Sequence, residues 1–169
     1  KRTAKHFKKI KINKIISANT KRARKTAEEI IKLLTCQVEY SSLLNEQSLG
    51  ILEGKSASEY RQALKESGLP EEEFRPINGE NRQDAYNRAK IFINKLKKEK
   101  AKNIIIVSHA GLISNIITLL LKMPIEENKN FKVAFCSISY FEIKKDFSIK
   151  DFFLNNITHL AKESDYYKK

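Results

Sequence analysis

The segment 104–113, IIIVSHAGLI, constrains the fold of this chain more than any other. Its first four residues are β-branched and predict a strand that is buried on both faces, like a central strand of a parallel sheet. The apolar run stops at Ser108 and His109, Gly111 follows, and apolar residues then recur at helical spacing from Leu112 to Leu121. The segment is therefore predicted to be a strand, a polar corner and a helix.

The corner of such a unit is a common place for a ligand. In open α/β sheets, ligands bind beyond the carboxyl ends of the strands, and the free N–H groups of a helix N-terminus attract anions. His109 therefore stands where a phosphate group would bind. The alternative is that His109 only ends the strand, and the segment alone does not decide between the two.

Other segments repeat the alternation of strand and helix. Short strands are expected at 14–17, 38–40, 133–143 and 149–154, and helices at 22–34, 56–66, 79–100 and 112–121. This order predicts an α/β fold, a three-layer α/β/α sandwich with a mainly parallel sheet and an antiparallel edge strand. We expect one domain over 1–169, with a small cap or insertion at about 56–79.

Composition limits the kind of protein. No apolar run approaches the ~20 residues that span a bilayer, and no signal peptide opens the sequence, so no membrane partner is expected. Cys36 and Cys136 lie far apart beside apolar residues, and we interpret them as small buried side chains in a reducing compartment. The sequence thus predicts a cytoplasmic protein.

The net charge of +13 raises the hypothesis of nucleic-acid binding. However, the lysines are spread over most of the predicted helices and both termini, and no basic stripe is interleaved with aromatic residues. A solvated surface that attracts a small anionic substrate is the preferred interpretation, and no nucleic-acid partner is expected.

Polar residues at four corners or loops are candidates for chemistry: Ser17 with Arg22, Glu46, Glu80 and His109. Each has a structural alternative, since Arg22 could be a surface residue, Glu46 solvated, and Glu80 a partner of a helix N-terminus. No group of residues has the spacing of metal ligands, so neither a metal nor a cofactor is expected.

Together these segments resemble one family, the histidine phosphatase or phosphoglycerate mutase-like superfamily. SANTKRARKTA (17–27) looks like its serine and Arg-Ala-x-x-Thr-Ala segment, and LNEQSLGILEG (44–54) resembles its glutamate loop. Gly-Glu-Asn at 79–81 is similar to its Gly-Glu-Ser helix start, and 105–111 to its strand ending in Ser-His-Ala-Gly. Residues 155–160 resemble its Asn-x-x-x-His-Leu ending.

The resemblance implies a metal-independent phosphatase that hydrolyses small phosphomonoesters through a phosphohistidine. It implies that Arg22 holds the phosphoryl oxygens, with Ser17 as a weaker contact, and that His109 and Glu46 are catalytic, Glu46 as the general acid. Glu80 and Ala110 would contact the substrate or support those that do. Arg24 lies about 200° around the helix from Arg22, so both cannot face one site.

One part of the family pattern is missing. The nucleophilic histidine belongs to an Arg-His-Gly motif after a first strand, and the sequence contains no such motif. We therefore expect that about thirty residues, the size of a βα unit, are absent, and that the chain as given is inactive. Phosphoglycerate mutase activity and a non-catalytic module that binds phosphorylated ligands remain alternatives.

Overall fold

The computed structural model describes residues 2–160 as alternating helices and strands. The strands of the main sheet follow the predicted segments closely: β1 (Lys14–Ala18), β2 (Gln37–Ser41) and β3 (Ile104–Val107). The helices are α1 (Arg2–Phe7), α2 (Lys21–Ile31), α3 (Ala57–Ser67), α4 (Arg82–Leu96) and α5 (Ala110–Leu120). The hairpin strands are β4 (Ile138–Ile143) and β5 (Ile149–Asn156).

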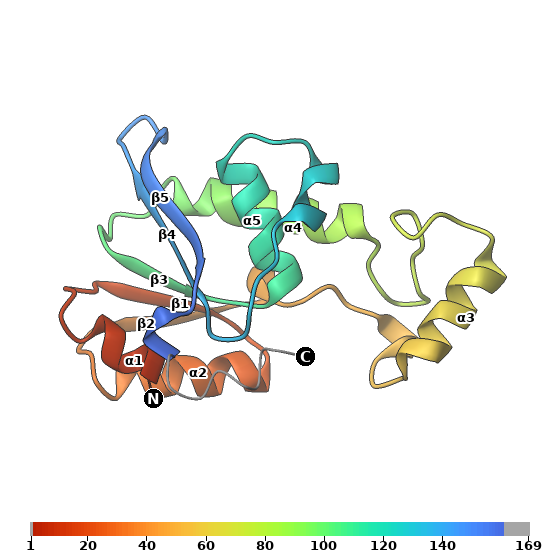
Figure 1. Ribbon diagram of the computed structural model, residues 1–169, viewed down its shortest axis with the longest axis horizontal. Helices are drawn as coiled ribbons and strands as arrows, with labels where there is room; N and C mark the ends of the chain where they lie inside the picture. Colours follow the sequence, from red (N-terminus) through yellow and green to blue (C-terminus); the bar gives the residue numbers. More distant parts are fainter. Residues whose placement is uncertain (1, 161–169) are drawn as a thin grey trace.

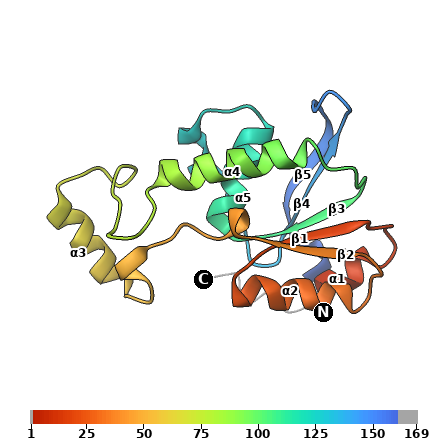
Figure 2. The same cartoon turned by 180° about the vertical axis from the view of Figure 1, so that it is seen from behind.

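The main sheet is parallel, with the strand order β2-β1-β3. Helices α1 and α2 lie on one face, and α4 and α5 on the other, which confirms the predicted α/β sandwich (Figures 1 and 2). The central strand in this sheet is β1, whereas β3 is at its edge, so the prediction of a central position for β3 is wrong for the described residues. A run of β-branched residues reports that helices cover both faces of a strand, not how many strands flank it.

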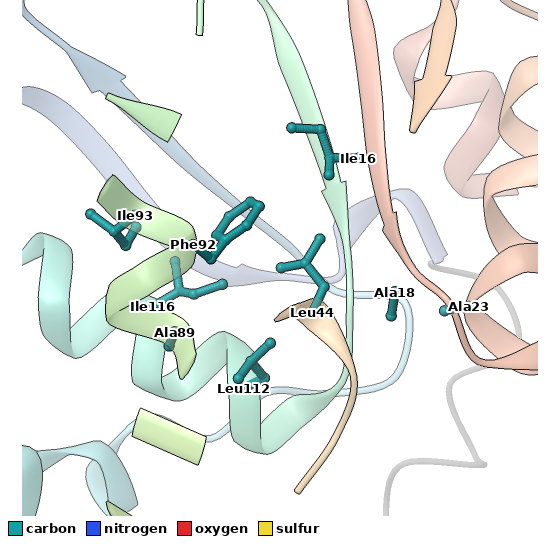
Figure 3. Packing of buried hydrophobic residues seen from close by; sticks show 9 residues of the cluster. All are labelled: Ile16, Ala18, Ala23, Leu44, Ala89, Phe92, Ile93, Leu112 and Ile116. Atoms are coloured by element: carbon teal, nitrogen blue, oxygen red, sulfur yellow. The ribbon is translucent and has the colours of Figure 1, made fainter. Parts of the chain in front are cut away.

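Successive residues of β1 pack into the core on opposite faces of the sheet. Ile15 packs with α1 and α2, and Ile16, its neighbour, packs on the opposite face with Phe92 of α4 and Ile116 of α5 (Figure 3). This alternation follows from the period of two along a strand. Leu44, from the loop after β2, is fully buried in the same cluster as Ile16 and fixes the start of the loop that carries Glu46.

The β4–β5 hairpin forms a separate antiparallel sheet that stands away from the main one in Figure 1. Its aromatic rings stack across the strands, Tyr140 on Phe153 and Phe141 on Phe152. The antiparallel pair is thus present as predicted, but it shares no hydrogen-bond ladder with β1–β3 among the described residues. Among the described residues, one edge of β3 is therefore not paired with another strand.

The segment that we predicted as a cap or insertion projects from the body on two closely apposed backbone segments (Figure 1). A Cβ atom on Gly50 would lie 2.0 Å from the carbonyl oxygen of Ile77, and one on Gly79 would lie 2.9 Å from that of Ser48. Helix α3 begins with a capping box at Ser56 and Glu59. None of its residues is buried, and Tyr60 is only half-buried.

Two further predictions, on the cysteines and on membrane-spanning segments, can be compared with the structure. Cys36 is half-buried, but Cys136 is exposed at a backbone φ of 57°, so its prediction as a buried residue is wrong: a turn carries it outward. In the part of the chain that the structure describes, no helix has both the length and the apolar character needed to span a bilayer. The predicted single domain includes residues outside the described range and stays a prediction.

Candidate active site

Two helix N-termini meet at the carboxyl ends of β1 and β3. Thr20 is the N-cap of α2 and His109 is the N-cap of α5, and neither side chain caps its own helix. Instead, Oγ1 of Thr20 lies 2.9 Å from Nε2 of His109. Neither helix carries an acidic residue in its first turn, whereas α3 and α4 both have complete capping boxes. The positive ends of α2 and α5 therefore converge without an acidic residue from the first turn of either helix.

His109 is held on both sides of its ring. Nε of Arg22 donates a hydrogen bond of 3.0 Å to Nδ1, opposite the Thr20 contact. The side chain is 8% exposed, and burial followed by the charge of Arg22 lowers the pKa of His109 from its ordinary value, with Glu46 acting in the opposite direction. The imidazole is thus kept neutral beside a guanidinium.

Glu46 faces the same corner from the loop after β2. Its Oε2 accepts a hydrogen bond of 3.3 Å from the backbone N–H of Gly111, in the first turn of α5. The carboxylate lies so close to α5 that a Cβ on Gly111 would be 2.7 Å from Oε1. The glycine in the Ser-His-Ala-Gly segment therefore makes room for Glu46.

Arg88 of α4 braces the loop that carries Glu46. Its guanidinium donates to the carbonyl oxygens of Leu43, Asn45 and Glu46, and binds both carboxylate oxygens of Glu80 at 2.8 Å. Burial raises the pKa of Glu80, but the hydrogen bonds from Arg88 and from the Ser48 N–H outweigh it, so that the pKa lies below its ordinary value. Glu80 is therefore an ionised part of the brace.

The remaining predicted site residues are placed differently. Ser17 is fully buried in β1, its hydroxyl donates to the carbonyl oxygen of Ala18, and its contact with a phosphoryl group stays a prediction. Ala110 is exposed in the first turn of α5. Arg24 lies over the ring of Tyr40 and donates a hydrogen bond to Oδ1 of Asn19.

The structure thus brings Arg22, Glu46 and His109 to one corner of the sheet. Sequence reasoning missed Thr20 and the brace by Arg88. A threonine directly before a predicted helix was a visible signal for an N-cap, but its contact with an N-cap 89 residues away was not. Within residues 2–160, no group of three histidine, cysteine or acidic side chains is arranged to hold a metal ion.

The fold places this corner at the carboxyl ends of the parallel strands of an α/β protein. Comparison with known proteins makes the class specific: the model of the histidine phosphatase superfamily (branch 1) matches residues 1–152. The chain belongs to this superfamily, as the sequence motifs indicated.

Proteins named as phosphatases are among the relatives of this chain. The Schizosaccharomyces pombe protein named "Probable phosphatase C1620.13" is 34% identical over 119 residues, which are 64% of this chain and 40% of the yeast protein. The crystal structure of the alpha-ribazole phosphatase from Shigella flexneri is similar with a TM-score of 0.75 and 25% identity, covering 92% of this chain and 79% of that one. A mycobacterial glucosyl-3-phosphoglycerate phosphatase, in complex with inorganic phosphate, shares the fold with a TM-score of 0.77 at 19% identity, covering 95% of this chain and 84% of that one.

Proposed function

We propose that the protein is a phosphatase that hydrolyses small phosphomonoesters. The observation that carries the proposal is the contact between Thr20 and His109, the N-caps of two helices that lack acidic first turns, with the Arg22 guanidinium alongside. Positive helix ends and a guanidinium attract a phosphate dianion. Family membership and the phosphatase names of the relatives support the proposal.

In the proposed reaction, Arg22 and the backbone N–H groups of the helix N-termini hold the phosphoryl oxygens and stabilise the charge of the transition state. A histidine nitrogen attacks phosphorus, the ester P–O bond breaks, and Glu46 gives its proton to the leaving alkoxide. Water then cleaves the phosphohistidine to inorganic phosphate. His109 does not attack the phosphorus atom, and no metal or cofactor takes part.

We further propose that the nucleophilic histidine belongs to a segment outside the printed sequence. Both ring nitrogens of His109 are engaged. His6 and His159 lie against each other, with ring centroids 5.4 Å apart, and neither has a described contact with the corner. The unpaired edge of β3, next to His109, would accept a further parallel strand whose carboxyl end reaches the same corner.

The test compares the printed chain with a form extended by its upstream coding sequence, using p-nitrophenyl phosphate and an alkyl phosphomonoester. We expect both forms to bind inorganic phosphate and only the extended form to hydrolyse esters and to yield an acid-labile phosphoenzyme. Phosphate binding without turnover in both forms would support the non-catalytic module instead. Transfer of the phosphoryl group to a sugar or glycerate hydroxyl in place of water would support a mutase. Absence of phosphate binding in both would contradict the proposed site.

A further inference from the structure

We propose that Thr20 is a phosphoryl-contacting residue: its hydroxyl accepts a hydrogen bond from Nε2–H of neutral His109 and donates its own proton to a phosphoryl oxygen of the substrate. This inference rests on the proposed function and extends it by a residue that the sequence-based prediction of the site did not include. It follows from the direction of two hydrogen bonds.

The direction of the first hydrogen bond is fixed by Arg22. A guanidinium has N–H donors and no acceptor, so the contact of 3.0 Å from its Nε requires a lone pair on Nδ1 of His109. The neutral imidazole then carries its proton on Nε2. The lowered pKa of His109, caused by burial and by the charge of Arg22, is consistent with this neutral form.

The direction of the second hydrogen bond follows. Because Nε2 carries the proton, it is the donor in the contact of 2.9 Å, and Oγ1 of Thr20 is the acceptor. The hydroxyl proton of Thr20 is not used in this contact. A hydroxyl that accepts from a donor is a better donor itself, since hydrogen bonds in a chain polarise one another.

The position of Thr20 indicates what this proton is for. As the N-cap of α2, the hydroxyl would ordinarily accept from a backbone N–H of the first turn, an interaction worth about 1 kcal/mol, but it makes no such bond. It points instead to His109, at the meeting point of the two positive helix ends. An anion held there by Arg22 would have acceptor oxygens within the reach of the hydroxyl proton.

The experiment uses Thr20→Val, which removes the hydroxyl with little change in shape, Thr20→Ser, which keeps it, and Thr26→Val as the matched control. Thr26 lies on the same helix, and among the described residues its hydroxyl donates to the backbone carbonyl of Arg22. All variants are checked for folding by circular dichroism. Binding of inorganic phosphate is measured by calorimetry, and nitrogen NMR reports which ring nitrogen of His109 carries the proton.

We expect the proton of wild-type His109 on Nε2, and a dissociation constant for phosphate that rises roughly tenfold in Thr20→Val, as for a lost hydrogen bond to a charged group. Thr20→Ser and Thr26→Val should bind like the wild type. A proton on Nδ1 would overturn the proposal, because Thr20 would then donate to His109. Equal phosphate affinity of Thr20→Val and wild type would overturn it while leaving the proposed function intact. If no form binds phosphate, the proposed site fails and Thr20 has no ligand to contact.

Discussion

At the scale of single residues, a substitution at Gly111 should lower the catalytic activity without lowering the stability of the fold. Replacement by alanine would place a methyl group 2.7 Å from the Glu46 carboxylate, which can move because it is the end of a flexible side chain. Alanine in a helix is otherwise favoured over glycine by about 1 kcal/mol. We expect Gly111→Ala to melt at the same or a higher temperature, while its activity toward an alkyl phosphate falls by roughly 10² in the active form of the protein.

Activity toward p-nitrophenyl phosphate should fall much less in Gly111→Ala, because that leaving group needs no protonation. Equal losses for both substrates would contradict the assignment of Glu46 as the general acid. Calorimetric melting curves recorded beside the kinetics separate displacement of the carboxylate from a general loss of folding.

A second residue-scale prediction concerns the pH response of His109. Removal of the guanidinium in Arg22→Gln should raise the pKa of His109, although not fully to its ordinary value, because burial is the larger cause of the shift. An NMR titration of the ring protons measures this directly. Arg24→Gln is the matched control, since Arg24 lies over Tyr40 and should leave the titration unchanged.

The sign of the effect on stability follows from the same shift. A histidine whose pKa is lowered in the folded state takes up its proton more readily when unfolded, so the free energy of unfolding falls as the pH drops below the ordinary histidine value. In Arg22→Gln this fall should be smaller. A steeper fall in the variant would mean that Arg22 stabilises protonated His109, contrary to the contact in the structure.

At the scale of elements, helix α4 supports the glutamate loop through one side chain. In the Arg88–Glu80 pair, the two side chains are 15% and 24% exposed, respectively, and the arginine also serves the carbonyl groups of the loop. We expect Arg88→Ala to lower the free energy of unfolding by about 3 kcal/mol, since it leaves partly buried acceptors without a donor. Urea denaturation measures the loss.

Arg75→Ala is the matched control for this prediction. Arg75 pairs with Asp84 on the same helix, but its side chain is 56% exposed, and such pairs contribute about 0–1 kcal/mol. Losses of similar size in the two variants would show that Arg88 is an ordinary surface residue and not a brace.

The elements also show how far sequence reasoning reached. Periodicity located β1, β3, α4 and β5 well, because each has a continuous apolar pattern, but β4 begins at Ile138 and not at 133 as predicted. Sequence reasoning failed where the outcome depends on distant partners: the number of strands beside β3, and the contact between the N-caps of α2 and α5. The motifs predicted Arg22, Glu46 and His109 at one corner, which the parallel order of the strands then explains.

At the scale of the whole molecule, the net charge of +13 should aid the approach of a phosphate ester to the corner. We expect the affinity for inorganic phosphate to decline severalfold between about 50 and about 200 mM salt, because screening acts over a Debye length of about 10 Å. Calorimetric titration at several salt concentrations measures this slope. A single-stranded oligonucleotide bound more tightly than phosphate, with a much steeper salt dependence, would contradict the expectation of no nucleic-acid partner.

The close crossing of the backbone at Gly50 and Gly79 has a consequence for how the protein can be remodelled. Both ends of the 51–78 excursion leave the body at one point, and its helix α3 buries none of its own residues. A cassette of another length or composition, spliced between these two glycines, would therefore leave the sheet and its corner undisturbed.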